Sequence, residues 1–552
     1  MKNSIRSRSH KEVAVVIAAA IAILVCLFSH LGAMGLAGPD EPRYVWIGRA
    51  MATSGDWVTP RLYGQPWFEK PVLYYWAAAV GYRLHLPAEL AGRLPSALAA
   101  LATAVSLGWL AAKHYGEGDG WLRSAAFAAP LVFSTSVAAI GFARGATPDM
   151  LFATALTLAM AIAAGILRRA GLLATAFGAE VSAAQREHVP LALFGACLGL
   201  AVLAKGPAGV VLAVGGMALW GLATDRWIAA LRFANPVALI AFCIVSLPWY
   251  VLCAQRNPDF LRVFLLEHNF QRYTTPFFQH KQPFWFFGPM LILALLPWTI
   301  LLIPAVREAL HRLRERQFSH SPALFFACWG VFPLVFFSIS QSKLPGYILP
   351  AIAPFSLILA LMWVRLASSN SPSLRWITVG FGVTWLGIGL SAAHWMHRLP
   401  PGARDALGRT MYFCAALAIA GGIAIAALGL TRKRGALALS VLLVVLLVEV
   451  AGARVLPSLD PYLSARWHAE LLRKDQRPDR LFTFHLQRSW NYGLAFYLGR
   501  ELPEWSPEDP EAALILTNPA GLEELRRLGR FRGVLPGDYK GVVYVPVLPA
   551  SH

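Results

Sequence analysis

Two short clusters of acidic, basic and aromatic residues lie close together near the N-terminus, directly after a long apolar segment. Residues 40–44 read DEPRY, and residues 67–71 read WFEKP. Ionisable groups beside a membrane are costly when they are desolvated and unpaired, so they are usually paired, solvated or functional. An interfacial anchor, with aromatic rings among the lipid headgroups, would explain either cluster alone. The two clusters together favour a functional site.

The acidic residues of these motifs are candidates for work at a sugar centre. Asp40 and Glu41 could supply a carboxylate for acid/base or electrostatic catalysis, since positive charge develops in an oxocarbenium-like transition state. Asp149 could do the same, with Arg144 five residues earlier as its charged partner. The alternative is a capping role, because Asp often caps a helix that Pro then opens.

Several basic residues beside the apolar segments are suited to hold a phosphate through charge-assisted hydrogen bonds. They are Arg43, Lys70, Lys205, Arg272 and Lys343. Any one of them could equally be a contact to a lipid headgroup. Glu69, His268 and His280 could form a carboxylate–imidazole site for a divalent metal such as Zn or Mg. The sequence spacing of these three residues matches no common pattern of metal ligands. We therefore favour the interpretation that the histidines are solvated residues of a loop.

Composition places the chain in a membrane. Of its 552 residues, 57% are hydrophobic and only 14% are charged, which excludes an ordinary soluble globule. The formal net charge of +19 is concentrated in short loops beside apolar segments, where it sets orientation, so we expect no nucleic-acid partner. The six cysteines all fall within apolar stretches and indicate neither a disulfide framework nor a thiolate metal site.

The apolar segments predict a polytopic α-helical protein with thirteen transmembrane helices. The first follows a basic N-terminus, runs to about Leu36 and lacks a clear cleavage site, so we expect it to be retained. The others lie near 93–113, 121–141, 149–167, 190–204, 206–223, 233–254, 285–304, 322–340, 347–366, 374–396, 409–430 and 435–453. The least secure boundary is at residues 205–207, where Lys-Gly-Pro divides one long apolar tract.

Charge predicts the orientation of these helices. With the N-terminus in the cytoplasm, every connection on the cytoplasmic side contains Lys or Arg, as the positive-inside rule requires. The polar stretches at 40–44, 67–76, 144–149, 267–280 and 340–347 then all emerge on the exoplasmic face. Loops that converge on one face can build a cavity at the membrane boundary.

Two domains are expected. Residues 1–453 form the transmembrane domain, with a large first exoplasmic loop at 37–92. Residues 454–552 mix short apolar runs at 512–516 and 541–547 with a helical stretch at 521–528, which predicts a small exported α/β domain. This domain shows no recognisable catalytic constellation, so we expect it to cap the loops.

The motifs resemble those of a known family. DEPRY at 40–44, SGDW at 54–57, FEKP at 68–71, RG with TPDM at 144–150, and SKLP with YILP at 342–350 resemble the bacterial lipid A 4-amino-4-deoxy-L-arabinose transferases. These enzymes have the C-type glycosyltransferase fold, as do the protein O-mannosyltransferases. The resemblance extends to about Pro354, with a weaker likeness at 484–498. Val72 departs from it, because the wider family often has a second Pro there.

The resemblance implies a function. The donor would be a sugar linked to undecaprenyl phosphate, the acceptor a phosphate of lipid A, and the site would face the periplasm of a bacterial inner membrane. Asp40 would be the main catalytic carboxylate and Asp149 the second. Lys70 would bind the carrier phosphate together with nearby basic and Tyr residues, namely Arg43, Tyr44, Tyr74, Arg144, Lys205, Arg272, Lys343 and Tyr347. No nucleotide cofactor is implied.

Other functions fit parts of the same sequence. Another polyprenyl-phosphate-sugar transferase, such as a protein mannosyltransferase, would use the same carboxylate as a general base on a hydroxyl acceptor. A lipid-linked sugar flippase would also need many spans, but transporters tend to show paired halves and charges at the midplane, and no repeat is visible here. A noncatalytic scaffold would not require carboxylates and bases on several converging loops.

Overall fold

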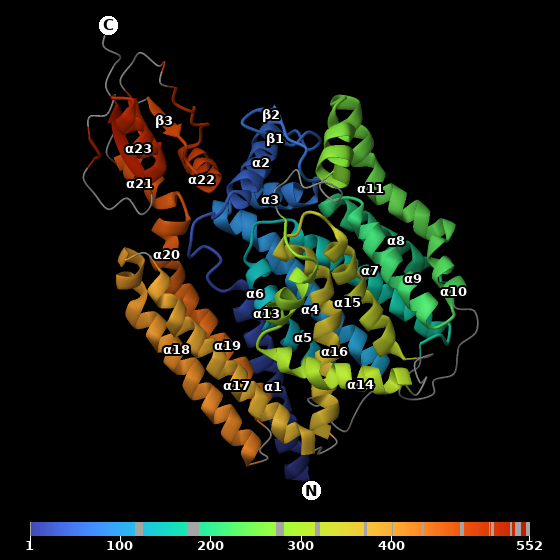
Figure 1. Cartoon of the computed structure of the whole chain (residues 1–552). Coiled ribbons are helices and arrows are strands. Elements are labelled where there is room, and N and C mark those ends of the chain that lie inside the picture. The colour runs from blue at the N-terminus through green and yellow to red at the C-terminus, as the bar shows by residue number, and fades with distance from the viewer. Residues whose placement is uncertain are drawn as a thin grey trace.

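The protein is a helical bundle with a small α/β domain at one end, as the computed structural model in Figure 1 shows. The N-terminus lies at the opposite end of the bundle from this domain. The structure describes residues 2–115, 125–173, 187–271, 281–314, 321–368, 372–399, 401–431, 435–474, 480–506, 508, 513–529, 533–535 and 542–547.

Among the described residues, nine helices are long and apolar enough to cross a membrane. They are α4 (Ala88–Tyr115), α7 (Asp149–Arg169), α8 (His188–Lys205), α11 (Pro236–Arg256), α15 (Pro322–Ile339), α16 (Leu349–Ser368), α17 (Pro372–Trp395), α18 (Pro401–Leu430) and α19 (Ala436–Val450). Two bent pairs raise this number to eleven. They are α5 (Ala125–Ser134) with α6 (Val137–Ala143), at 62°, and η4 (Phe284–Phe286) and α13 (Phe287–Ala294) with η5 (Trp298–Leu301) and α14 (Leu302–Arg314), at 111°.

Two shorter apolar helices complete the correspondence with the expected spans. They are the apolar part of α1 (Lys2–Phe28) and α9 (Ala208–Ala223). Each of the thirteen expected segments therefore has a helix or a bent pair in the structure, while thirteen full crossings stay a prediction. The boundary at 205–207 lies where the sequence places it, because α8 ends at Lys205 and α9 begins at Ala208.

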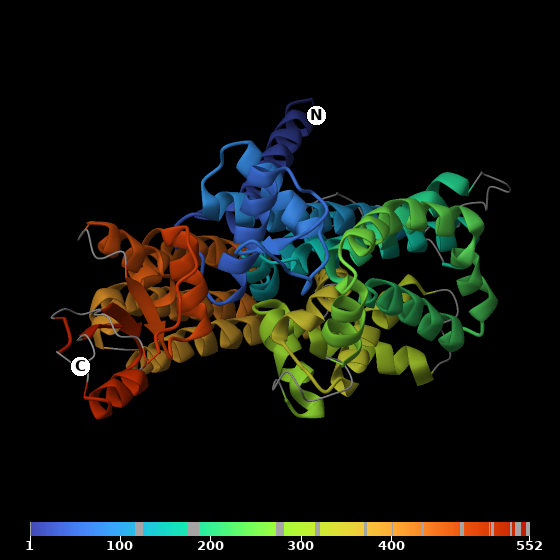
Figure 2. The same cartoon turned by 90° about the horizontal axis from the view of Figure 1, so that it is seen from above.

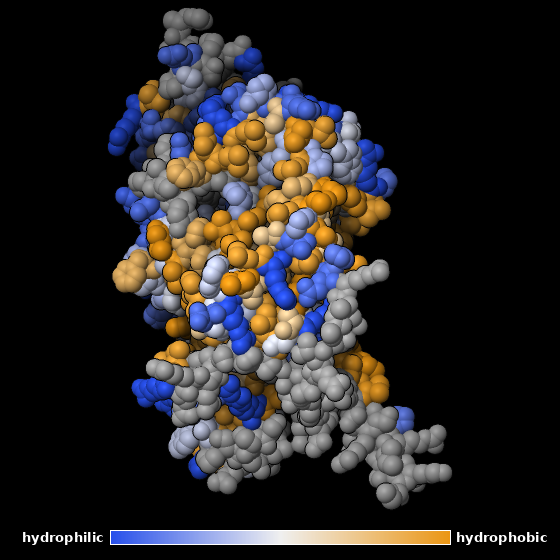
Figure 3. Space-filling model, turned by 90° about the vertical axis from the view of Figure 1, so that its right-hand side faces the viewer, coloured by the Kyte–Doolittle hydropathy of each residue, from blue (hydrophilic) through white to orange (hydrophobic). Residues whose placement is uncertain are grey.

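The outer surface suits a lipid environment. Large apolar side chains on α11 are exposed to the outside of the bundle, namely Leu239, Ile240, Ile244, Leu247, Val251 and Leu252. Figure 3 shows many hydrophobic residues across the middle of this side of the molecule, with hydrophilic residues near its upper end and in patches lower down. Exposed apolar surface of this extent is typical of a protein that is solvated by lipid tails.

The segment between α1 and α4 lies against the end of the bundle that carries the α/β domain (Figure 1). It contains α2 (Asp40–Ser54), the short hairpin of β1 (Arg61–Leu62) and β2 (Gln65–Pro66), and α3 (Leu73–Arg83). Helix α2 ends because Gly55 adopts a left-handed conformation with φ of 74° and donates its N–H to Met51. A buried cluster of aromatic and aliphatic residues joins α2 and α3 to α8 and α11.

The C-terminal region forms a small α/β unit. Its sheet has the order β3-β4-β5, with β3 (Leu481–Phe484) parallel to β4 (Ala513–Thr517) and β5 (Val543–Val547) antiparallel to β4. Its helices are α20 (Leu456–Leu463), α21 (Arg466–Lys474), α22 (Arg488–Leu498) and α23 (Pro519–Arg527). The π-helix η8 (Ala451–Val455) continues α19 directly, so the domain is joined to the bundle through an unbroken helical segment.

Short helical turns complete the described chain: α10 (Trp227–Leu231), η2 (Arg232–Ala234), the π-helix η3 (Arg262–Gln271), η6 (Pro345–Ile348) and η7 (Met396–Arg398). The view from above in Figure 2 shows the C-terminal domain beside the first loop, and α22 contacts α2. The domain is therefore a neighbour of the motif at residues 40–44 rather than a separate appendage.

Candidate active site

The first turn of α2 places one buried arginine between two carboxylates. Arg43 donates from Nη1 to Glu69 Oε2 at 2.8 Å, from Nη2 to Asp40 Oδ1, and from Nε to the carbonyl of Pro39 at 2.8 Å. The side chain of Arg43 is 5% exposed, whereas that of Asp40 is 50% exposed. Asp40 does not cap α2 through its side chain, so the capping alternative is not found. Asp40 is held from one side and open on the other.

Arg43 is kept charged although it is buried. Burial by itself would lower the pKa of Arg43, but the carboxylates of Glu69 and Asp40 raise that pKa above its usual value. Aromatic rings surround the guanidinium, at 5.6 Å from Trp67 and 5.0 Å from Tyr492. Tyr492 belongs to α22, so the C-terminal domain contacts the site directly.

Glu41 has a different environment from its neighbour. Its carboxylate accepts from Arg93 Nη2 at 2.7 Å and Nε at 3.2 Å, from the Ala37 N–H at 2.8 Å and from the Ala146 N–H at 2.7 Å. Glu41 is buried, and these four bonds occupy both of its oxygens. The geometry therefore assigns Glu41 to positioning and leaves Asp40 as the carboxylate of the pair that a substrate can reach.

A second group of charges continues from the first. Lys70 Nζ lies 3.5 Å from Glu69 Oε1, and it also interacts electrostatically with Asp149. Asp149 forms an ion pair with Lys205 at the end of α8. Together with Arg43 and Asp40, these side chains form an alternating row of three acids and three bases. The row joins the first loop to the start of α7 and the end of α8.

The loop before α16 packs against the end of this row that holds Asp149 and Lys205. The Lys205 ammonium lies 5.2 Å from the ring centroid of Tyr347. Gly346 allows the close approach, because a Cβ there would lie 2.9 Å from the ring of Phe142 and 3.4 Å from Asp149 Oδ1. The predicted site residue Tyr347 is thus placed beside Asp149 and Lys205.

Arg144 is not where the sequence placed it. Its guanidinium donates to the carbonyls of Cys26, Val25 and Ser29, the last two at 3.3 Å. These carbonyls belong to the last turn of α1 and to the residue that follows it, where a helix leaves several of its last carbonyls without intrahelical partners. The expectation that Arg144 pairs with Asp149 is wrong, since Lys205 does so. As a phosphate ligand, Arg144 would have to give up these bonds.

Two of the predicted tyrosines lie in the buried cluster that joins α2 and α3 to their neighbours. Tyr44 and Tyr74 are buried, with ring centroids 6.1 Å apart, and the Tyr74 hydroxyl donates to the Gly92 carbonyl at 2.8 Å. Burial raises the pKa of both hydroxyls well above the usual value. Tyr74 therefore helps to fix α3 against α4, and its hydroxyl already has a partner within the protein.

Lys343 lies at a separate apolar cavity. Its ammonium donates to the Ser340 carbonyl at 2.5 Å, and the side chain is largely buried. The cavity has a volume of about 690 Å³. Its lining is formed by Phe284, Trp285, Phe287, Gly288, Leu334, Val335, Ser338, Ile339, Gln341 and Lys343.

The predicted metal ligands are not brought together in the part of the chain that the structure describes. There, no group of three His, Cys, Asp or Glu side chains could hold a metal ion. Glu69 is instead engaged by Arg43 and Lys70, and two cations beside it disfavour a third. His268 lies in η3, whereas His280 and Arg272 lie outside the described residues. The metal site stays a prediction.

Two residues that serve this site were missed by the sequence reasoning. Arg93, on α4, donates a hydrogen bond to Glu41, and the ring of Tyr492, on α22, lies against the guanidinium of Arg43. Arg93 lies in a helix that reads as an ordinary transmembrane segment, although a charge inside such a helix is a signal for function. Tyr492 is about 450 residues from Arg43, and no local pattern reports that contact.

Comparisons with known proteins show which proteins the chain is similar to. Residues 13–264 match the family described as dolichyl-phosphate-mannose-protein mannosyltransferase. The undecaprenyl phosphate-alpha-4-amino-4-deoxy-L-arabinose arabinosyl transferase of Edwardsiella ictaluri is 33% identical over 337 residues, 61% of this chain and 57% of that protein. The protein of the same name from Pseudomonas aeruginosa strain UCBPP-PA14 is 32% identical over 370 residues, 67% of this chain and 62% of that protein. The chain thus spans about three fifths of the length of these relatives.

Solved structures extend the similarity to almost the whole chain. The crystal structure of ArnT from Cupriavidus metallidurans bound to undecaprenyl phosphate has a TM-score of 0.76 and 23% identity, and the match covers 97% of this chain and 98% of that one. The structure of the same protein in the apo state gives a TM-score of 0.74. The chain therefore has the C-type glycosyltransferase fold of ArnT, and its sequence is similar to those of the aminoarabinose transferases, as its motifs predicted.

Proposed function

We propose that this protein transfers 4-amino-4-deoxy-L-arabinose from undecaprenyl phosphate to a phosphate of lipid A. The observation that carries the proposal is the row of alternating charges from Asp40 through Arg43, Glu69, Lys70 and Asp149 to Lys205. Such a row offers cations to a phosphate and carboxylates to a cationic sugar within one site. Relatives that are 32–33% identical to this chain over about three fifths of their length carry this activity in their names.

The chemistry balances without an added proton donor. An oxygen of the acceptor phosphate attacks the anomeric carbon of the sugar, and the bond from that carbon to the carrier phosphate oxygen breaks. The bonding electron pair leaves with the carrier phosphate, which changes from a diester to a monoester and gains negative charge. The acceptor phosphate is already largely ionised near neutral pH, since its second pKa is about 6. A general base is therefore not required.

The charged residues then have distinct roles. Lys70 and Arg43 stabilise the charge that accumulates on the leaving phosphate. Asp40, the exposed carboxylate, orients the acceptor or stabilises the cationic sugar in the transition state. Asp149 and Lys205 fix one another at the far end of the row and face Tyr347. The predicted divalent ion would supply further positive charge beside the phosphate.

The fold offers a place for the lipid tail of the donor. The cavity of about 690 Å³ beside Lys343 is lined mainly by apolar side chains. Apolar cavities with a few polar groups are typical of sites for lipids and other small molecules. We assign it to part of the isoprenoid chain, with the site itself on the periplasmic side of a bacterial inner membrane.

The direct test is reconstitution of the purified protein with defined substrates. Undecaprenyl-phosphate-linked aminoarabinose and lipid A are supplied, and the product is identified by its mass. We expect lipid A to gain one aminoarabinose on a phosphate. Transfer of mannose from a polyprenyl phosphate to a peptide hydroxyl, with no modification of lipid A, would support a protein mannosyltransferase instead. A flippase would move the donor across the bilayer and form no product.

A further inference from the structure

The backbone of the segment that leads into α2 is hydrogen-bonded by side chains along its whole length. This segment, residues 31–37, is called the strap here, and it ends three residues before Asp40. From the membrane domain, Arg93 donates to the carbonyls of Leu31, Met34 and Gly35 at 2.7, 2.7 and 2.8 Å. Glu41 accepts from the N–H of Ala37 at 2.8 Å. These bonds hold one side of the strap.

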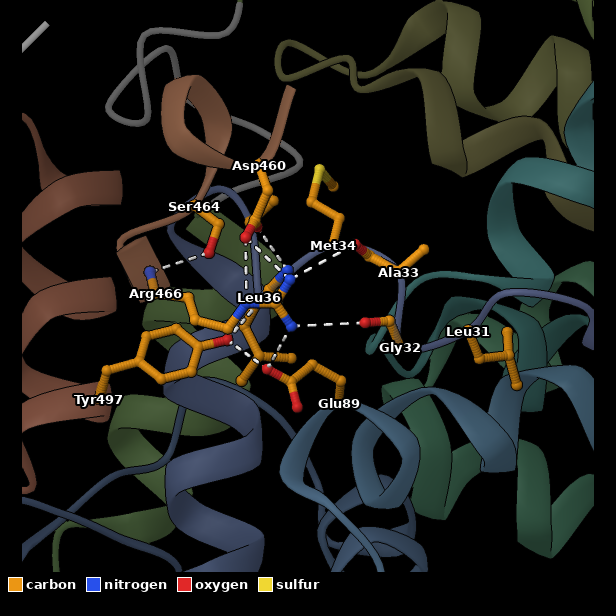
Figure 4. A network of polar contacts seen from close by, with 12 residues as sticks. Leu31, Gly32, Ala33, Met34, Leu36, Glu89, Asp460, Ser464, Arg466 and Tyr497 are labelled. Atoms are coloured by element: carbon orange, nitrogen blue, oxygen red, sulfur yellow. Dashed lines mark hydrogen bonds and ion pairs between the residues drawn. The ribbon is translucent and has the colours of Figure 1, made fainter. Parts of the chain in front are cut away.

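The C-terminal domain holds the other side. Asp460 Oδ1 accepts from the N–H of Gly35 at 2.7 Å, and the hydroxyl of Tyr497 accepts from the N–H of Leu36 at 2.7 Å. Arg466 makes longer contacts of 3.4 Å with the carbonyls of Gly32 and Ala33. Figure 4 shows these side chains pointing toward the strap from the C-terminal domain. Non-helical backbone is therefore satisfied by side chains from two domains.

The side chains that hydrogen-bond the strap also form hydrogen bonds and ion pairs with one another and with Glu89. Arg466 donates to Asp460 Oδ2 from Nε at 3.0 Å and from Nη2 at 2.8 Å. Tyr497 donates to Glu89 Oε1 at 2.7 Å, and Arg466 Nη1 lies 3.5 Å from the same oxygen. Glu89 belongs to α4, which also carries Arg93. The network thus links α4, the strap and the C-terminal domain in one unit.

Close packing leaves little freedom at this junction. A Cβ on Gly35 would lie 2.7 Å from the Tyr497 hydroxyl and 2.9 Å from the Cβ of Arg466, and it would also collide with Ser464. Ala37 and Ser464 form an isolated antiparallel bridge. Glycine is therefore required at position 35 by the approach of the C-terminal domain.

We infer that the C-terminal domain is a positioning part of the active site, acting through Asp460, Arg466 and Tyr497 on the strap. The strap is joined through Pro39 to Asp40, and it is bonded to Glu41, so its position sets the position of both carboxylates. A displacement of about 1 Å far from the reacting atoms can cost about 100-fold in rate. This inference rests on the proposed transferase function, and it replaces the expectation that the domain is only a cap.

The test uses two substitutions in the full-length protein. Tyr497→Phe removes one hydroxyl and leaves the ring, and Arg466→Met removes the charge but keeps much of the side-chain volume. We expect each to lower kcat by about 10- to 100-fold, with the donor KM changed much less because Lys70 and Arg43 are untouched. Arg466→Lys keeps the charge but not the forked geometry, so it should recover part of kcat. Hydrogen exchange at the amides of Gly35 and Leu36 should become faster in all three variants.

The matched control is Arg526→Met on α23. Arg526 is also an arginine of the C-terminal domain and pairs with Glu523 at 2.6 Å. The substitution Arg526→Met should leave kcat and the rate of hydrogen exchange at the strap amides unchanged. Unchanged kcat in both Tyr497→Phe and Arg466→Met, with normal strap exchange, would overturn the inference. Failure of the wild-type protein to modify lipid A would instead refute the proposed function, and the exchange measurement would still decide whether the domain fixes the strap.

Discussion

At the scale of single residues, adjacent acids have separate tasks because burial and partners differ between them. Glu41 is surrounded by four donors from Arg93, Ala37 and Ala146, whereas Asp40 has one side open. A carboxylate that accepts four protein hydrogen bonds has no capacity left for a substrate. The pair therefore combines one structural acid with one acid that can act on the sugar or the acceptor.

Asp40→Asn is expected to retain folding and lose turnover. The amide preserves the size of the side chain and can still accept from Arg43, but it removes the negative charge that would face a cationic transition state. Loss of one preorganised electrostatic contact typically lowers the rate by about 10²–10³. Transfer to lipid A is measured beside the thermal midpoint and the elution profile of the protein. Activity like that of the wild type would remove Asp40 from the mechanism.

Lys70 is expected to act on both binding and bond cleavage. Its ammonium lies 3.5 Å from Glu69 and interacts electrostatically with Asp149, and its favourable interaction energy with the carrier phosphate grows as that phosphate gains charge. Lys70→Ala should therefore lower kcat and raise the donor KM together. Lys70→Arg keeps the charge but changes the shape and reach of the side chain. Its kcat and donor KM should therefore lie between those of the wild type and those of Lys70→Ala.

Steady-state kinetics with lipid-linked aminoarabinose measures both effects of the Lys70 substitutions. A lysine that only contacts bulk headgroups would leave the turnover of the inserted protein almost unchanged in both variants. In that case the phosphate contact would have to be reassigned, and Arg43 would be the next candidate in the charged row.

At the scale of elements, the C-terminal sheet and its helices are held together partly by a buried histidine. His468 on α21 is fully buried, and its Nδ1 lies 2.8 Å from the Tyr544 hydroxyl of β5. The rings of Trp467 and Trp490 pack at 5.0 Å from the imidazole. Burial lowers the pKa of His468 to about 4, so this histidine is neutral in the folded domain near neutral pH.

This pKa predicts how the domain responds to acid. The unfolded chain binds a proton at His468 below its ordinary pKa of about 6.5, whereas the folded domain resists protonation down to a pKa of about 4. The contribution of neutral His468 to the free energy of unfolding is therefore fully present above pH 6.5. It falls as the pH drops from 6.5 toward 4, by about 3 kcal/mol at most. The thermal midpoint across this range measures the loss. His468→Phe should flatten the slope, and equal slopes in both proteins would contradict the assignment.

At the scale of the whole molecule, helix α2, which carries Asp40 and Arg43, and the C-terminal domain lie at the same end of the bundle, opposite the N-terminus (Figure 1). The bundle carries exposed apolar side chains on α11, and its charged site is partly buried where the first loop meets the start of α7 and the end of α8. A lipid-linked substrate would meet the protein there, because its tail stays in the bilayer while its phosphate stays at the boundary.

The predicted orientation can be tested with a reporter at the C-terminus. An odd number of crossings with a cytoplasmic N-terminus exports the C-terminal domain, so alkaline phosphatase fused after His552 should be active. A fusion to a fluorescent protein that matures only in the cytoplasm is the matched control and should stay dark. Fluorescence from that fusion would refute the thirteen-span arrangement.

The sequence by itself determined the class of fold and pointed to the acids and bases that form the charged row. Apolar segment length predicts spanning helices, because the backbone in lipid must satisfy its own hydrogen bonds. The motifs at 40–44 and 67–71 and the acid at Asp149 carry their chemistry in their residue types, and the structure joins them in one row. These features are local in the chain, so a sequence can report them.

Only the tertiary structure decided which side chains meet. It paired Asp149 with Lys205 instead of Arg144, and it separated the role of Glu41 from that of Asp40. It also brought Tyr492, Arg466 and Tyr497 from the end of the chain onto the first loop. Contacts of this kind depend on how helices pack across hundreds of residues. Hydrophobic periodicity fixes which face of a helix is buried but not which partner it meets.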